Sequence, residues 1–333
     1  MSSFLKQKKI LVTGADGFIG SHLVERLVEY GASVKAFVFY NSWNSIGWLS
    51  DIDQNVLNNI EIFVGDIRDS SCVNEAIKGV HYVYHLSSLI GIPYSYYATE
   101  SYVDTNIKGT LNVLNACKNN NHHELLLHTS TSEVYGTAQH VPIDENHPIV
   151  GQSPYSATKI AADKLVESYN LSFSLPIITA RPFNTFGPRQ TSRAIIPTII
   201  TQLLSNSNEL KLGDVSTTRD FNFVQDTVEG ILSISENLKL IGKVLNIGSG
   251  REWSIEQTAK IIMKLMNKNI EIISDQKRKR PKNSEVERLL ADNSLILSQT
   301  NWKPSFDFED GLEKTINWIK NNKNFFRDNK FLI

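Results

Sequence analysis

The most constraining feature of the sequence is a short apolar run that leads directly into three evenly spaced glycines. The run is Lys9–Thr13, and a glycine follows at every third position from residue 14 to residue 20. In a strand–turn–helix context these glycines permit a tight turn, a close backbone approach to a pyrophosphate, and close packing of helix on strand. The segment predicts a dinucleotide-binding loop, with a structural glycine turn as the alternative. The residues assigned to the loop are Gly14, Gly17, Phe18, Ile19 and Gly20.

Apolar runs that are typical of buried strands alternate with helical patterns through the first half of the chain. Helical patterns cover Thr110–Lys118 and Ala157–Tyr169, among others. Strands that alternate with helices predict an α/β fold with a Rossmann-type, doubly wound parallel sheet. The predicted strands are Lys9–Thr13, Val34–Phe39, Glu61–Val64, Tyr82–Leu86, Glu124–Thr129 and Pro176–Arg181.

The pattern changes after Arg181, which indicates a second, smaller part of the protein. Phe221–Val224 and Lys243–Ile247 have the composition of strands that return to the sheet, and residues 250–333 are mainly helical. We therefore predict two domains. The Rossmann domain, which binds NAD(P), comprises residues 1–183 and 222–249, and a smaller C-terminal substrate-binding domain comprises residues 184–221 and 250–333.

Charge and cysteine content exclude several classes of function. The chain has 34 Lys and Arg against 35 Asp and Glu, which argues against nucleic acid as the main partner. Two cysteines are too few for a disulfide framework and favour a reducing, cytoplasmic location. Residues 1–9 lack the apolar region of a signal peptide, and no apolar run approaches the roughly 20 residues of a membrane span. We therefore expect no membrane partner.

A metal site is not expected. His122 and His123 are adjacent in a polar segment, but no carboxylate or cysteine stands at ligand spacing from them. Structural and catalytic metal sites need three or four such ligands.

A second motif carries acid–base chemistry. Tyr155 and Lys159 are four residues apart at the start of a predicted helix, so their side chains lie on one face. An ammonium group beside a phenol favours the phenolate and lowers the phenol pKa, which makes a tyrosine a usable base near neutral pH. A surface pair on a helix is the alternative. Thr129–Gly136 follows the fifth predicted strand, where the ends of parallel strands line a ligand crevice.

These motifs together resemble the extended type of the short-chain dehydrogenase/reductase superfamily, over nearly the whole chain. The resemblance implies that Thr131 completes a catalytic triad with Tyr155 and Lys159. It also implies that Asp66 and Ile67 meet the adenine, although Asp66 alone is equally compatible with a turn. The cofactor-binding residues that the resemblance implies, besides the glycine loop, are Asp66, Ile67, Leu86, Ser87, Asn106, Tyr155 and Lys159.

The second strand departs from the pattern of NAD-binding proteins. An acidic residue is expected there for the ribose 2′-hydroxyl, but the position is Val38, followed by Phe39, Tyr40 and Asn41. No arginine stands nearby for a 2′-phosphate. We predict that the cofactor is NAD, with NADP as an open alternative. Discrimination between the two dinucleotides should be weak and should depend on Tyr40 and Asn41.

The run Thr131-Ser132-Glu133 resembles the nucleotide-sugar 4,6-dehydratases, and the GDP-mannose dehydratases most of all. In these lyases a carboxylate takes the proton from C5 of the sugar, which implies that role for Glu133. The dTDP-glucose dehydratases have an Asp where this chain has Ser132, so the acid for the leaving C6 hydroxyl stays open between Ser132 and protonated Glu133. The alternative for Glu133 is a structural carboxylate at the start of a helix, where the helix dipole favours a negative charge.

Three further segments resemble the substrate-binding motifs of the same family. Arg181–Pro188 resembles RxxNxxGP, which implies that Asn184 touches the sugar or the diphosphate. Arg219 begins an R-D-F motif whose arginine pairs with the diphosphate, a role that suits a forked cation. Arg280 begins an RP…EV segment that reaches the nucleotide end. Each motif taken alone is also compatible with a surface ion pair.

A narrower resemblance is to the N-acetylglucosamine-nucleotide 4,6-dehydratases of legionaminic acid biosynthesis. It implies a UDP- or GDP-linked N-acetylglucosamine substrate, a role in bacterial surface-glycan synthesis, and NAD(P) as cofactor, and the choice of nucleotide stays open. The segments that carry it are Ile92–Tyr96, Tyr102–Asn106, Thr129–Gly136 and Gly151–Tyr155.

Rival functions follow from the same motifs. A UDP-glucuronate decarboxylase and a nucleotide-sugar 4-epimerase are the enzymatic alternatives, and a non-catalytic NAD(P)-binding regulator is the alternative of another class. Intact Thr131, Tyr155 and Lys159 argue against the regulator. The resemblance also implies a homodimer through Thr105–Lys118 and Ala157–Tyr169, which carry apolar residues on more than one face.

Overall fold

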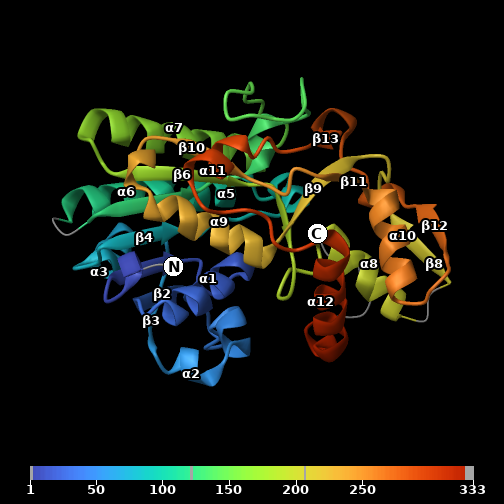
Figure 1. Cartoon of the computed structure of the whole chain (residues 1–333), viewed down its shortest axis with the longest axis horizontal. Coiled ribbons are helices and arrows are strands. Elements are labelled where there is room, and N and C mark those ends of the chain that lie inside the picture. Colours follow the sequence, from blue (N-terminus) through green and yellow to red (C-terminus); the bar gives the residue numbers. More distant parts are fainter. Residues whose placement is uncertain (1–2, 121–122, 206–207, 327–333) are drawn as a thin grey trace.

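The computed structural model describes residues 3–120, 123–205 and 208–326 (Figure 1). Its centre is a seven-stranded parallel sheet with the order β10-β6-β5-β4-β1-β2-β3. The order of the first six strands is that of a doubly wound dinucleotide fold, which confirms the predicted fold class. The strands are β1 Lys9–Thr13, β2 Ser33–Phe39, β3 Ile60–Gly65, β4 Tyr82–His85, β5 Leu125–Thr129, β6 Ile177–Pro182 and β10 Val244–Ile247.

Helices cover both faces of this sheet, which explains why its strands are apolar runs rather than alternating ones. On one face, Leu23, Ile231 and Ile296 pack in one core cluster. They come from α1 Phe18–Glu29, α9 Val224–Glu236 and α11 Ser294–Gln299. On the other face, Val113 and Val166 pack in a second cluster. The helices of that face are α3 Ser70–Ile77, α6 Gly109–Asn119 and α7 Pro154–Phe173.

A smaller sheet lies beside the large one and is centred on β9 Thr218–Phe223. The prediction that Phe221–Val224 returns to the large sheet is wrong, whereas the predicted strand at Lys243–Ile247 is confirmed as β10. Phe221 and Phe223 belong to a separate core with Phe186 and Phe308, so their apolar character serves that core. The partners of β9 are β7 Asn184–Phe186, β13 Arg288–Leu289 and, antiparallel, β11 Glu252–Ser254.

Three helices and a two-stranded parallel sheet complete the smaller part, at the right of Figure 1. They are α8 Ile195–Leu204, α10 Ile255–Leu265 and α12 Phe308–Asn321, with β8 Glu209–Leu212 and β12 Glu271–Ser274. Ile296 and Trp302 stand between β12 and α12 in the sequence, but they pack into the core of the large sheet.

The remaining elements are short. The α-helical ones are α2 Gln54–Leu57, α4 Ile92–Ser95 and α5 Thr99–Tyr102, and a π-helix, Val103–Lys108, leads into α6. The 3₁₀ helices are Ser3–Leu5, Gly47–Asp51, Ser132–Tyr135, Leu238–Leu240, Gln276–Arg278, Lys282–Ser284 and Lys323–Phe325. Within the described part of the chain, no helix combines the length and the apolar character that crossing a bilayer requires.

The turn between β1 and α1 is so tight that side chains would collide in it. Gly14 has a φ of +69°, and a Cβ placed on it would lie 2.9 Å from the Ser87 amide nitrogen. A Cβ on Gly20 would lie 2.0 Å from the Gly14 carbonyl oxygen. The turn therefore brings bare backbone to the carboxyl edge of the sheet, between β1 and β4, as a phosphate cradle requires.

Gly20→Ala should destabilise the protein because the methyl group has no room. We expect the free energy of unfolding to fall by about 1–3 kcal/mol, the usual cost of overpacking. Gly91→Ala is the matched control, since its φ is −70° and a Cβ there would first meet the Tyr102 hydroxyl oxygen at 3.5 Å. Thermal unfolding followed by circular dichroism should show a loss for Gly20→Ala alone; equal stability of the two variants would contradict the close approach.

Candidate active site

The loop after β5 presents the first candidate catalytic residues. Thr131 caps the 3₁₀ helix Ser132–Tyr135, and its hydroxyl oxygen accepts a hydrogen bond from the Glu133 amide at 3.2 Å. Ser132 and Glu133 are both buried, with exposed fractions of 2% and 9%. In the described part of the chain, no hydrogen bond or ion pair to another residue engages the Glu133 carboxylate. It is therefore a buried, ionisable group without a structural partner.

The start of α7 fixes the position of Tyr155. A reciprocal capping box joins Ser153 and Ser156: the Ser156 amide donates to the Ser153 hydroxyl at 3.1 Å, and the Ser153 amide donates to the Ser156 hydroxyl at 3.0 Å. Pro154 occupies the first helical position, where its missing N–H costs nothing. Tyr155 is thereby held in the first turn, and Lys159 follows one turn later on the same face.

The two segments converge on one point. Besides burial, the Thr131 hydroxyl and the charge of Glu133 both act on the pKa of the Tyr155 phenol, so the two segments lie close together. The same carboxylate also acts on the pKa of Arg219, which comes from β9 of the smaller sheet. The charge of Glu133 thus acts on a candidate base and on a cation of the substrate side.

The expected lowering of the Tyr155 pKa is not found. Burial raises the pKa of the phenol, the hydrogen bond with Thr131 opposes this rise, and the charge of Glu133 adds to it. The Lys159 ammonium is directed instead at the Thr129 carbonyl oxygen, 2.7 Å away. Burial lowers the pKa of Lys159 to about 8, and Asp163 opposes that shift.

The glycine loop is braced by the ends of the neighbouring strands. Thr13 accepts hydrogen bonds from the amides of Leu86 and Ser87 at 3.1 and 3.2 Å, and its hydroxyl meets His85 Nδ1 at 2.8 Å. Burial lowers the pKa of His85 well below its usual value. The backbone of Leu86 and Ser87 consequently lies against Gly14.

Two other predicted cofactor residues have partners within the protein. The Asn106 amide bridges the backbone of Leu89 and the hydroxyl of Thr158, at 2.8–3.0 Å. The Asp66 carboxylate binds the Arg68 guanidinium, with a shortest distance of 2.6 Å. Both side chains therefore stabilise the conformation of their surroundings through bonds within the protein. Ile67 is buried and lies against Gly109.

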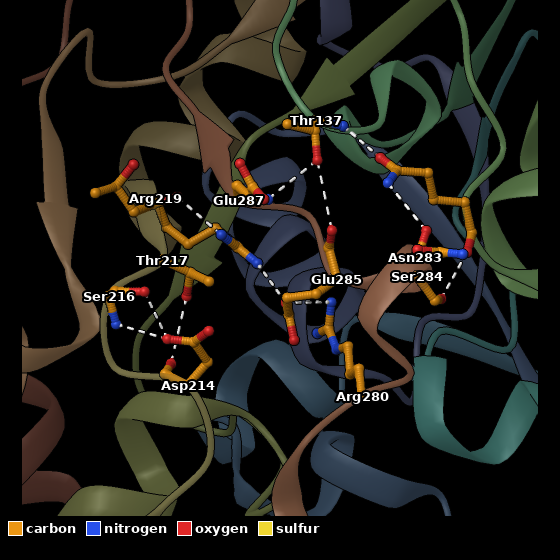
Figure 2. A network of polar contacts seen from close by, with 12 residues as sticks. Thr137, Asp214, Ser216, Thr217, Arg219, Arg280, Asn283, Ser284, Glu285 and Glu287 are labelled. Atoms are coloured by element: carbon orange, nitrogen blue, oxygen red, sulfur yellow. Dashed lines mark hydrogen bonds and ion pairs between the residues drawn. The ribbon is translucent and has the colours of Figure 1, made fainter.

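The substrate side is built around Glu285 (Figure 2). Its Oε1 lies 3.3 Å from Arg219 Nη2 and 3.4 Å from Arg280 Nη1, so one carboxylate serves two cations. The Arg219 side chain is 6% exposed, and the buried Arg280 Nη1 makes no hydrogen bond. Asn184 on β7 also has a buried Oδ1 without a partner. The two guanidinium groups can bind an anionic ligand in place of Glu285, and Asn184 Oδ1 can accept a hydrogen bond from a ligand hydroxyl.

The segment that carries Glu285 is attached to the large domain. Ser284 donates to the Gln152 carbonyl oxygen at 2.6 Å and meets the Tyr96 hydroxyl at 2.6 Å. The Glu287 amide donates to the Thr137 hydroxyl at 3.1 Å. The segment with Arg280 and Glu285 is therefore attached to the loop just before α7, and Figure 2 shows Arg219 and Arg280 beside Glu285.

Sequence reasoning missed the buried network beneath Lys159. Asp163 accepts hydrogen bonds from His128 at 3.1 Å, from Ser130 at 2.8 Å and from Arg181 at 2.9 Å. The i+4 spacing of Asp163 from Lys159 was visible in the sequence. The distant partners were not, because they come from β5 and β6.

Asp163→Asn should be strongly destabilising because it leaves the buried Arg181 guanidinium uncompensated. We expect a loss of about 3–5 kcal/mol in the free energy of unfolding. Glu167→Gln is the control on the same helix: its pair with Lys164 is more than half exposed and should contribute less than about 1 kcal/mol. Denaturant unfolding at neutral pH measures both, and equal losses would contradict the buried ion pair.

The difference in the free energy of unfolding between wild type and Asp163→Asn should depend on pH in a defined direction. Burial alone would raise the pKa of Asp163, but the hydrogen bond from His128 and the charges of Arg181 and Lys159 lower it to about 2. Since this lies below the value of about 3.9 in an unfolded chain, the stabilisation is complete above about pH 4 and is lost as the pH falls towards 2. A gap between wild type and Asp163→Asn that widens on acidification would contradict this assignment.

No group of three or more His, Cys, Asp or Glu side chains is arranged to hold a metal ion within residues 3–120, 123–205 and 208–326. His122, one of the two adjacent histidines, lies outside these ranges.

Comparisons with known proteins agree with this geometry. Residues 11–315 match the family model described as GDP-mannose 4,6 dehydratase. A putative UDP-glucose 4-epimerase of Methanocaldococcus jannaschii is 31% identical, over 94% of this chain and 99% of its own length. A dTDP-D-glucose 4,6-dehydratase of Dictyostelium discoideum is 31% identical, over 96% of this chain and 83% of its own length.

A solved structure extends the likeness to three dimensions. UDP-glucuronic acid 4-epimerase from Bacillus cereus, in complex with UDP-glucuronic acid and NAD, has a TM-score of 0.85 at 29% identity and covers 94% of this chain and 99% of its own. The match of the family model across most of the sequence, together with the shared fold, shows that the chain belongs to the GDP-mannose 4,6-dehydratase family of nucleotide-sugar dehydratases and epimerases.

Proposed function

We propose that the protein is an NAD-dependent nucleotide-sugar 4,6-dehydratase. The observation that carries the proposal is Glu133, a buried carboxylate whose charge acts on both Tyr155 and Arg219. A dehydratase needs a base for the C5 proton in addition to the base for the C4 hydroxyl, whereas hydride removal and return alone do not. The turn after β1 has no room for side chains at Gly14 and Gly20, which supports a close approach of a dinucleotide to its backbone. The NAD in the related epimerase structure also supports this cofactor.

The two arginines give the substrate its orientation in this proposal. A diphosphate carries two negative charges and suits the forked guanidinium groups of Arg219 and Arg280. It would compete there with Glu285, which lies within 3.4 Å of both. The unpartnered buried oxygen of Asn184 can accept a hydrogen bond from a sugar hydroxyl, whereas a contact with the diphosphate would use the amide nitrogen.

The reaction then divides between residues of α7 and of the loop after β5. Bound NAD supplies an acceptor that takes hydride from C4 and returns it to C6. Tyr155 takes the O4 proton, with Thr131 as its hydrogen-bond partner and Lys159 as the cation one turn along the helix. Glu133 removes the C5 proton, which the neighbouring C4 ketone makes acidic. Water leaves from C6 with a proton from Glu133 or from Ser132, which is buried in the same turn.

The sequence resemblance to the dehydratases of legionaminic acid biosynthesis supports a narrower substrate. We propose N-acetylglucosamine linked to UDP or GDP, and a 4-keto-6-deoxy sugar nucleotide as product, made in the cytoplasm for a bacterial surface glycan. A 4-epimerase and a UDP-glucuronate decarboxylase remain the alternatives. An epimerase would use Tyr155 but would have no proton-transfer task for Glu133.

Glu133→Gln separates these functions. The amide keeps the size of the side chain but cannot act as a base, so the variant should form reduced NAD on addition of the sugar nucleotide and then stall. Loss of general-base catalysis should lower the rate of product formation by about 10²–10⁴-fold. Absorbance of the reduced nicotinamide in a stopped-flow instrument measures the first step, and mass spectrometry measures the product.

Tyr155→Phe is the matched control, because it removes the base of the first step and should abolish reduction of NAD as well. Normal turnover by Glu133→Gln would refute the assignment of the base. Release of carbon dioxide from UDP-glucuronate, without water loss from any hexose, would instead favour the decarboxylase.

We also propose a homodimer in which α6 and α7 pair with their counterparts. Leu171 and Phe173, at the end of α7, have exposed fractions of 76% and 51%, which a partner helix would cover. Light scattering at micromolar concentration should give twice the chain mass of 37.5 kDa. A monomeric mass would exclude this assembly.

A further inference from the structure

The carboxyl end of β2 lacks the acidic residue that usually reads the adenosine ribose of NAD. In doubly wound dinucleotide folds an Asp or Glu at this end binds the 2′-hydroxyl. Here Val38 is fully buried, and Phe39, the last residue of β2, is half exposed. Neither hydrocarbon side chain can distinguish a hydroxyl from a phosphate.

A carboxylate reaches this position from the glycine loop instead. Asp16 Oδ2 accepts a hydrogen bond from the Phe39 amide at 3.2 Å. The Asp16 backbone is fixed as well, because its carbonyl oxygen accepts from the Trp48 amide at 3.0 Å. A Cβ on Gly47 would come within 2.4 Å of that same carbonyl oxygen. The loop after β2 thus closes tightly against Asp16.

The polar side chain of Asn41, just beyond the end of β2, is already engaged. The Asn41 amide caps its own loop, with bonds to Phe39 and Ser45. The two cations of this edge are paired, Arg68 with Asp66 at 2.6 Å and Lys35 with Glu61 at 3.4 Å.

The Asp16 carboxylate itself is not neutralised. Across the described ranges, no ion pair joins Asp16 to a cation, and its Oδ1 makes no hydrogen bond to another residue. Burial raises the pKa of this carboxyl, whereas the Phe39 amide favours its ionised form. One oxygen of a carboxylate fixed at the end of β2 therefore has free acceptor capacity.

We propose that Asp16 selects NAD over NADP, by accepting a hydrogen bond from the adenosine 2′-hydroxyl and by repelling a 2′-phosphate. The carboxylate occupies the place of the missing β2 acid in space, although it comes from a different point in the sequence. This inference rests on the NAD dependence of the proposed function. It replaces the expectation of weak discrimination through Tyr40 and Asn41.

The test compares the binding of NAD and NADP, so it does not depend on turnover. Dinucleotide released from the purified protein is first identified by mass spectrometry, and dissociation constants are then measured by calorimetry. Wild type should carry NAD and prefer it by at least about 100-fold, since like charges at close range disfavour a ligand strongly. Asp16→Asn should reduce the preference to less than about 10-fold, mainly through tighter binding of NADP.

Two further variants keep the result interpretable. Asp16→Ser retains an acceptor for the Phe39 amide without the charge and should behave as Asp16→Asn does. Asp53→Asn removes a charge from the same loop region, where Asp53 caps α2, and should leave the preference unchanged. Circular dichroism of each variant would check that it is folded.

A wild-type preference below about 10-fold, or an unchanged preference in both Asp16 variants, would overturn the proposal. Selective NAD binding that depends on Asp16, in a protein that dehydrates no sugar nucleotide, would support this inference and contradict the proposed function alone.

Discussion

The site depends on the buried ion pair between Asp163 and Arg181. Asp163 lies on α7, and its partners lie on β5, on β6 and in the loop after β5. This one carboxylate therefore holds the helix that carries Tyr155 and Lys159 against the strand ends that present Thr131 and Glu133. Because the Asp163 carboxylate is separated from water, each of its hydrogen bonds contributes more to stability than it would on the surface. Loss of Arg181 or Asp163 would leave the other charge buried without a partner, which destabilises the fold. Geometry at the reacting atoms follows from that constraint.

The second requirement is that two sheets meet at one place. The large sheet supplies the glycine loop, Tyr155 and Glu133, and the smaller sheet supplies Arg219. The segment with Arg280 and Glu285 runs between them and is attached to the large sheet through Gln152 and Thr137. An anion that displaced Glu285 would bridge both parts, so substrate binding and the relative position of the two sheets are coupled in this arrangement.

Local patterns in the sequence predicted the large sheet well. The strands of the first half lie within one or two residues of their predicted bounds, because each is a short apolar run buried on both faces. The strand at Phe221–Val224 was assigned to the wrong sheet, since an apolar run does not reveal which core it enters. Thr131, Glu133 and Tyr155 lie near one another in the structure, but the roles that the resemblance implies for them stay predictions. The Tyr155 pKa, the role of Asp163 and the position of Asp16 depend on burial and on contacts between distant segments, which no local spacing reveals.

The central claim is that proton transfer at C5 accompanies hydride transfer, and hydrogen exchange with the solvent tests it most directly. The wild-type protein is incubated in deuterated water with UDP- and GDP-linked N-acetylglucosamine, and the product is analysed by mass spectrometry and proton NMR. A dehydratase that uses Glu133 as its base gives a product that has lost one water and carries one solvent deuterium at C5. A product of unchanged composition, epimerised at C4 and free of deuterium at C5, would contradict the claim.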